Sequence, residues 1–219
     1  MRFPVLTAGV TAVTAVVDIV QFAVPGTLER LERTPALLHG EWWRAVTSLF
    51  VQDGGIAGTV SNLLFLVLLG TLAEQVLDKP RWLVQYFGVG IASEFLGCLW
   101  QPVGGGNSIA LCGLAGAVAV ALWRRDVRLP GWASPAAVLW CGALLATAWL
   151  PLIFVGIVAA GVMQRRAWAM RPAAVSVLAV GIALSALTNL HGGSLLIGLV
   201  VALGTASWRN SAAIAAPAA

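Results

Sequence analysis

The sequence predicts an all-α polytopic membrane protein, and three observations support this class. Apolar residues make up 59% of the 219 residues, whereas charged residues make up only 10%. A soluble core of this size could not bury so many apolar side chains, so lipid is the expected solvent. Apolar segments of spanning or near-spanning length follow one another along the chain, and tryptophans mark their ends as an interfacial aromatic belt would. We expect one transmembrane domain over residues 1–219.

The charged residues assign the ends of these segments to the two sides of a membrane. The segments lie at about 6–24, 56–77, 82–100, 109–123, 136–163, 173–187 and 189–207. Lysines and arginines gather at segment ends, at 79–81, 124–128, 165–171 and 209, and the positive-inside rule places these groups in the cytoplasm. The long segment 25–55 balances its arginines with Glu29, Glu32, Glu41 and Asp53, so we expect it to form an outer loop.

The segment 136–163 does not fit a single span. Basic residues flank it on both sides, so both of its ends should lie in the cytoplasm. Pro151 lies at its middle, where proline removes a backbone donor and breaks a helix. We therefore predict an extra helical hairpin at about 136–163, whose arms of about 14 and 12 residues are short for a core of ~30 Å. The alternative is one long tilted span with the arginines of 164–172 outside.

Other classes of site are not indicated. The net charge of +4 comes from arginines placed between apolar segments, so we expect no nucleic-acid partner. Cys98, Cys112 and Cys141 are odd in number and lack metal-ligand spacing, so we expect neither disulfides nor a metal, and no cofactor. The expected partners are the lipid bilayer and a transmembrane protein that is a client or a substrate.

Five short motifs then occur in one order along the chain. They are Trp43-Arg44 with Thr47, Asn62 opening an apolar run, Gly70 with Glu74 and then Arg81 and Tyr86, Gly113-Leu114-Ala115-Gly116-Ala117, and His191-Gly192-Gly193 with Gly198. This order resembles the rhomboid family of intramembrane serine proteases over about 40–207. The resemblance implies a six-helix rhomboid-like core, in which a helix starting at the nucleophile packs against the histidine helix. It also makes a multi-pass protein of a bacterial plasma membrane the expected setting.

The resemblance assigns roles to four positions. The family's nucleophile motif is Gly-x-Ser-Gly, and its serine position is taken here by Ala115; His191 takes the general-base position. Asn62 takes one oxyanion position, and Gly58 stands where the family carries a second, a histidine. Because alanine has no atom that can attack a carbonyl, the resemblance implies that the chain lacks peptidase activity by the family's route. Small residues at Gly113, Gly116, Gly193, Ser194, Gly198 and Ala202 predict close approach of the two helices.

Two other residues could act as a displaced nucleophile. Ser108 lies seven residues before Ala115, and Cys112 lies one residue before the motif. We expect Ser108 to cap the helix that begins near Ile109, and Cys112 to pack in the core. A further possibility is that Ala115 is an engineered replacement of serine.

Three functions follow from these observations. A rhomboid-like protein without peptidase activity could bind transmembrane clients, and this is the function we predict first. An active rhomboid endopeptidase that cleaves single-span proteins is the alternative, if another residue supplies the nucleophile or Ala115 is engineered. A small transporter is the third, because Asp18 and Glu94 are ionisable at membrane depth and Pro151 breaks a helix. The sequence leaves the oligomeric state open.

Overall fold

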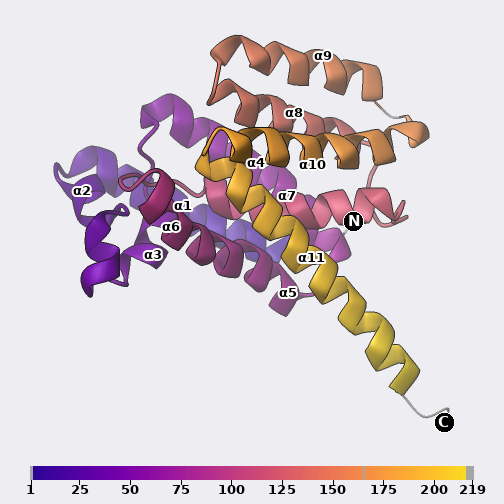
Figure 1. The fold of residues 1–219 in the computed structure, drawn as a ribbon, viewed down its shortest axis with the longest axis horizontal. Helices are drawn as coiled ribbons and strands as arrows, with labels where there is room; N and C mark the ends of the chain where they lie inside the picture. Colours follow the sequence, from indigo (N-terminus) through magenta and orange to yellow (C-terminus); the bar gives the residue numbers. More distant parts are fainter. Residues whose placement is uncertain (1, 165, 216–219) are drawn as a thin grey trace.

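The computed structural model describes residues 2–164 and 166–215 and confirms the all-α membrane fold (Figure 1). Three helical stretches are long and apolar enough to cross a membrane: α1 (Val5–Ala23), α4 (Gly55–Val76) and the continuous stretch Lys79–Trp100. That stretch consists of α5 (Lys79–Leu83), a π-helical turn η3 (Val84–Gly88) and α6 (Val89–Trp100). Four shorter apolar helices follow, α7 (Ser108–Trp123), α8 (Ala133–Ala146), α9 (Ile153–Met163) and α10 (Met170–Ala186). The last helix is α11 (Leu190–Ala215), whose apolar part is Leu190–Thr205.

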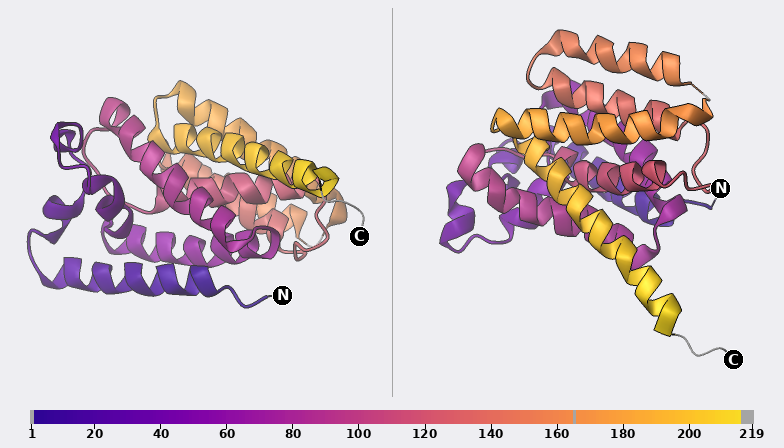
Figure 2. Two further views of the ribbon diagram at one scale, coloured as in Figure 1. Left: turned by 90° about the horizontal axis from the view of Figure 1, so that it is seen from below. Right: turned by 45° about the vertical axis from the view of Figure 1, so that its right-hand side comes forward.

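The segment between α1 and α4 forms a folded cap at one end of the bundle. It contains α2 (Thr27–Leu31), η1 (Pro35–His39), α3 (Arg44–Thr47) and η2 (Ser48–Phe50). Figure 2 shows this cap at the left end of the bundle, with the N-terminus at the opposite end. The predicted outer loop at 25–55 therefore has a compact structure of short helices.

A polar contact inside the bundle fixes α1 to α4. The backbone N–H and the hydroxyl of Thr7 both donate to Glu74 Oε1, at 2.6 and 2.8 Å. A Cβ added to Gly70 would lie 2.6 Å from the Thr7 side chain, so only glycine permits this approach. Asp18 of α1 faces the bundle interior, because only 3% of its surface is exposed.

The helices α7 and α11 cross at glycines, as the small-residue pattern predicts. A Cβ added to Gly116 would lie 2.5 Å from the Gly198 carbonyl carbon, and one added to Gly198 would lie 2.8 Å from the Gly113 Cα. Only glycine lets two backbones approach so closely, and close packing is the main attraction between helices in lipid. Gly193 has a different neighbour, since its added Cβ would meet Leu96 of α6 at 2.5 Å.

The helical hairpin predicted at 136–163 is confirmed as α8 and α9. The chain reverses around η4 (Leu150–Leu152), which contains Pro151, and the two arms meet where Gly142 and Gly156 face each other. The alternative of one long tilted span is therefore wrong. With α1, α4, the stretch 79–100, α7, α10 and α11 as the six core helices, the hairpin is an addition between α7 and α10.

Both basic flanks of the hairpin lie at the same end of the bundle. The Arg171 guanidinium at the start of α10 stacks on the Trp123 ring at the end of α7, 5.4 Å from its centre. Arg165 lies outside the described residues, and the Arg209 side chain is not among those described. The basic end is opposite the cap, in agreement with the predicted sidedness.

Candidate active site

The site is built where α7 and α11 both begin. Ser108 is the first residue of α7 and His191 is the second residue of α11. The two helices run in the same direction and cross at Gly113, Gly116 and Gly198, so their first turns lie side by side. The Ser108 hydroxyl lies 2.9 Å from His191 Nε2, which is hydrogen-bond distance.

Asn189 fixes the orientation of the histidine ring. Its side-chain Oδ1 accepts the backbone N–H of His191 at 3.0 Å and lies 3.0 Å from His191 Nδ1. Because a carbonyl oxygen can only accept, Nδ1 must carry the proton, which leaves Nε2 as the acceptor for the Ser108 hydroxyl. The Asn189 amide in turn donates to Thr147 Oγ1 of the α8–α9 turn at 3.0 Å. The hairpin is thereby connected to the histidine.

Donor groups converge on the same space. The first N–H groups of α7 have no acceptor within the helix, as at any helix start. A Cβ added to Gly106 would lie 3.5 Å from Ser108 Oγ and 3.7 Å from Asn62 Nδ2, so the hydroxyl and that amide both lie close to Gly106. Asn62 Nδ2 donates to Gln52 Oε1 at 2.7 Å, which holds the amide in place. A cavity of about 90 Å³ lies next to the serine, lined by Ser108, His191, the glycine loop and the charged residues Arg33, Asp53 and Glu94.

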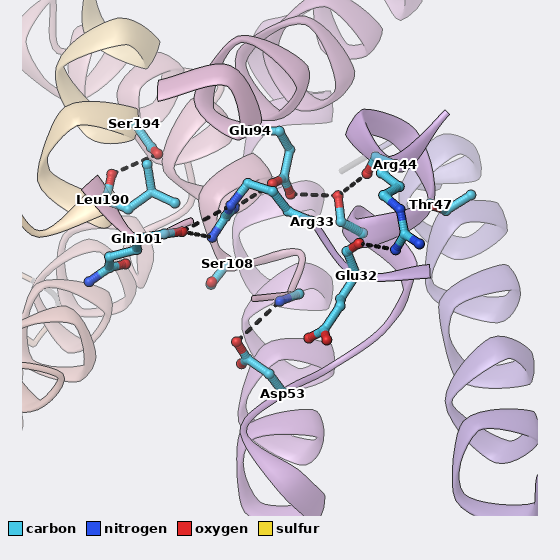
Figure 3. A network of polar contacts seen from close by, with 12 residues as sticks. Glu32, Arg33, Arg44, Thr47, Asp53, Glu94, Gln101, Ser108, Leu190 and Ser194 are labelled. Carbon is cyan, nitrogen blue, oxygen red and sulfur yellow. Dashed lines mark hydrogen bonds and ion pairs between the residues drawn. The ribbon is translucent and has the colours of Figure 1, made fainter. Parts of the chain in front are cut away.

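A buried ion pair fixes the loop that precedes Ser108. The Arg33 guanidinium pairs with Glu94 of α6 and donates to the Gln101 carbonyl at 2.7 Å (Figure 3). The Arg33 backbone exchanges hydrogen bonds with Gly104, and Asp53 accepts the Gly105 N–H at 3.1 Å. The cap, α6 and the glycine loop are therefore held together directly above the serine.

A second arginine, Arg44, ties parts of the cap to one another. The Arg44 guanidinium donates to the carbonyl oxygens of Glu29 and Glu32 and pairs with Glu41. Glu32, which is half-buried next to the glycine loop, has a raised pKa because burial disfavours its charged form and Asp53 and Glu29 add negative charge nearby.

Comparison with known families agrees with this arrangement. A family model described as the Rhomboid domain matches residues 39–208, most of the chain. The chain belongs to the Rhomboid family. No curated protein and no solved structure matches it.

The structure does not bring the predicted rhomboid nucleophile position, Ala115, to His191. Ala115 lies seven residues after Ser108, about 10 Å further along the axis of α7, and is completely buried. Its neighbour Gly116 contacts Gly198, which is also seven residues beyond His191. Ala115 therefore lies at the helix crossing, two turns from the histidine, and the predicted pairing was wrong for this reason.

The other predicted positions have different outcomes. Asn62, one helical turn after Gly58, lies near Gly106 of the glycine loop but is not among the residues that line the cavity of Ser108 and His191. The space around Gly58 is open, because an added Cβ would meet nothing within 4 Å. Cys112 is buried in the core, as expected. Ser108 was expected to cap α7, but it is the first helical residue and contacts His191 instead.

From the sequence, Ser108 was only one of two possible displaced nucleophiles and was expected to cap α7, although a signal for its contact with His191 was present. Gly106-Asn107-Ser108-Ile109 matches the first three positions of the rhomboid Gly-x-Ser-Gly motif and carries isoleucine at the fourth. The signal is the separation of seven residues that both helices share, from Ser108 to Ala115 and from His191 to Gly198. If the glycines of the two helices pack together, the residue opposite His191 must lie near position 108.

Proposed function

We propose that this rhomboid-family protein is an intramembrane serine endopeptidase in which Ser108 is the nucleophile and His191 the general base. The observation that carries the proposal is the hydrogen-bond distance of 2.9 Å between Ser108 Oγ and His191 Nε2, with Nδ1 held by Asn189. A nucleophile bonded to a base that a third group orients is the general arrangement of covalent hydrolases.

The proposed chemistry follows from these positions. Ser108 Oγ attacks the carbonyl carbon of the scissile peptide bond while its proton passes to His191 Nε2. The carbonyl electron pair moves onto oxygen, and the Asn62 amide and the free N–H groups at the start of α7 stabilise that charge. His191 then protonates the leaving nitrogen as the C–N bond breaks. Water hydrolyses the remaining ester of Ser108 with the histidine as base.

The substrate class follows from the setting. The site lies between helices, at the end of the bundle opposite the basic flanks, and the positive-inside rule makes that the outer face of a plasma membrane. A single-span membrane protein could present its chain there if its helix unwinds near that face. The proposed substrates are therefore transmembrane proteins cleaved near their outer end.

Two features favour a second function, which is binding of transmembrane clients without hydrolysis. Gly58 provides no oxyanion donor, and Ile109 replaces the small residue that usually follows the serine. Loss of one such donor typically lowers the rate about 10²- to 10³-fold but does not abolish the reaction. The nucleophile and the base, which the covalent route requires, are both present as Ser108 and His191. The observations therefore favour slow peptidase activity over none.

The transporter function lacks support. Glu94 pairs with Arg33 in the cap, and the break at Pro151 is the turn of the hairpin. These two of the three features that prompted that hypothesis have structural roles, and the third, Asp18, is buried in the bundle.

The test is cleavage of a single-span substrate in proteoliposomes by the parent chain and by S108A, H191A and A115S. We expect S108A and H191A to lose at least about 10³ of the rate, because the covalent route is gone. A115S should cleave at a rate near the parent's, since its hydroxyl would lie two turns from His191. Activity that survives S108A, or no cleavage of any tested substrate by the parent, would reject the proposal and favour client binding.

A further inference from the structure

The end of the bundle opposite Ser108 carries arginines that the fold does not neutralise. Asp78 pairs with Arg81, and Asp126 pairs with Arg128. In the part of the chain that the structure describes, Arg124 and Arg171 form no ion pair, and both are exposed. Arg171 is held in place by stacking on Trp123.

An apolar groove reaches this end along the surface of the bundle. Beyond their crossing at Gly116 and Gly198, α7 and α11 diverge, and Figure 1 shows α11 running obliquely across and past the bundle. A groove of about 530 Å³ lies between α7, α10 and α11. Its walls are largely apolar, with Val120, Trp123, Val175, Leu178, Leu199 and Leu203 among the lining residues.

The groove ends at a guanidinium. Arg124 lines the groove and also lines a second, smaller pocket of about 40 Å³, together with Arg81 and Arg128. Val120 is shared by the two pockets as well. The apolar groove therefore adjoins a pocket in which Arg81 and Arg128 are paired with Asp78 and Asp126, so Arg124 is the arginine that both share and that has no ion pair among the described residues. This end of the bundle is the one that the positive-inside rule places in the cytoplasm.

We propose that this groove binds an anionic phospholipid, with an acyl chain between α7, α10 and α11 and the negatively charged headgroup at Arg124 and Arg171. The apolar walls alone would accept the chain of any lipid. The unpaired guanidiniums favour a lipid with net negative charge, because a zwitterionic headgroup adds a cation next to them. Anionic lipids are also enriched on the face to which this end is assigned. The site is independent of Ser108 and of any hydrolysis.

The probe is phosphatidylglycerol, compared with phosphatidylcholine of the same acyl chains in mixed micelles. We expect the purified protein to unfold at a higher temperature with phosphatidylglycerol, and native mass spectrometry to find it retained. The R124Q/R171Q variant should bind it about 25-fold more weakly, since each basic residue contributes about a fivefold factor. R30Q is the matched control, because Arg30 is an exposed arginine of the cap at the other end.

A second pair of variants tests the groove without changing charge. L203W fills the groove and should reduce lipid retention, whereas V200W places the same side chain on α11 outside the groove and should not. Inorganic phosphate should cause no thermal shift, because it has no acyl chain. Equal stabilisation of the parent by the two lipids would overturn the proposal. So would an unchanged preference in R124Q/R171Q, or equal lipid retention by L203W and V200W.

Discussion

Replacing Gly198 with alanine tests whether the helix crossing holds the two candidate catalytic residues together. The added Cβ would lie 2.7 Å from the Cys112 carbonyl oxygen and 2.8 Å from the Gly113 Cα. Ordinary contacts of this kind begin near 3.4 Å, and both neighbours are backbone atoms that cannot rotate away. The helices must therefore separate by somewhat less than ~1 Å. Such overpacking costs about 1–3 kcal/mol of the free energy of unfolding.

The same displacement should lower the cleavage rate strongly even though the protein stays folded. The crossing lies two turns below the contact between Ser108 and His191, so a shift of either helix is transmitted to the site. A misplacement of about 1 Å can cost roughly 10² in rate. We expect G198A to cleave a single-span substrate up to about 100-fold more slowly while it remains folded in detergent.

Gly204 provides the control on the same helix. A Cβ added there meets nothing within 4 Å, and replacing glycine by alanine within an exposed helix gains about 0.5–1 kcal/mol. G204A should therefore unfold at an equal or higher temperature and cleave at the parent's rate. If G198A matches G204A in both measurements, α7 and α11 do not pack as described and the reasoning is refuted.

Three further predictions concern the site and the cap. N189A should lower kcat roughly 10- to 100-fold, because the ring of His191 loses a hydrogen bond of about 1–3 kcal/mol. N189D keeps an acceptor for the ring and should retain more activity than N189A. Equal rates for N189A and the parent would contradict the orienting role. G58H should raise the cleavage rate by up to about 10² if its ring donates to the oxyanion, whereas G58L, which fills the same open space without a donor, should not. Glu32 has a raised pKa in the folded protein, so the folded state binds more protons than the unfolded state. The free energy of unfolding should therefore fall as the pH rises from 4.5, the ordinary pKa of a glutamate, through the raised pKa. Chemical unfolding of E32Q should show a smaller fall over this range, and the same pH dependence in E32Q and the parent would contradict the prediction.

Much of the fold could be predicted because it depends on local physical rules. Pro151 and the basic residues on both sides of 136–163 were sufficient to predict the hairpin. The small residues at Gly113, Gly116 and Gly198 were sufficient to predict a close helix crossing. The signals are local patterns, namely a proline between basic flanks and small residues at helical spacing within each helix, and such spacing fixes which residues share a helix face.

The exact pairing across helices could not be obtained in the same way. Gly106-x-Ser108 lies at the start of the apolar segment and Gly113-x-Ala115 lies within it, and the two short motifs differ by two helical turns. Because they are seven residues apart, the two motifs lie on the same face of α7, so only the contact with α11 shows which of them is opposite His191. The Arg33–Glu94 pair was missed for a related reason, since the two residues are 61 positions apart and no local pattern links them.

The central claim is that Ser108 is a nucleophile activated by His191, and mapping of a covalent adduct tests it most directly. The purified protein would be treated with a fluorophosphonate, and the modified residue identified by peptide mass spectrometry. We expect the adduct on Ser108, with labelling lost in S108A, greatly slowed in H191A and unchanged in A115S. An adduct on another residue, or equal labelling of the parent and H191A, would contradict the claim.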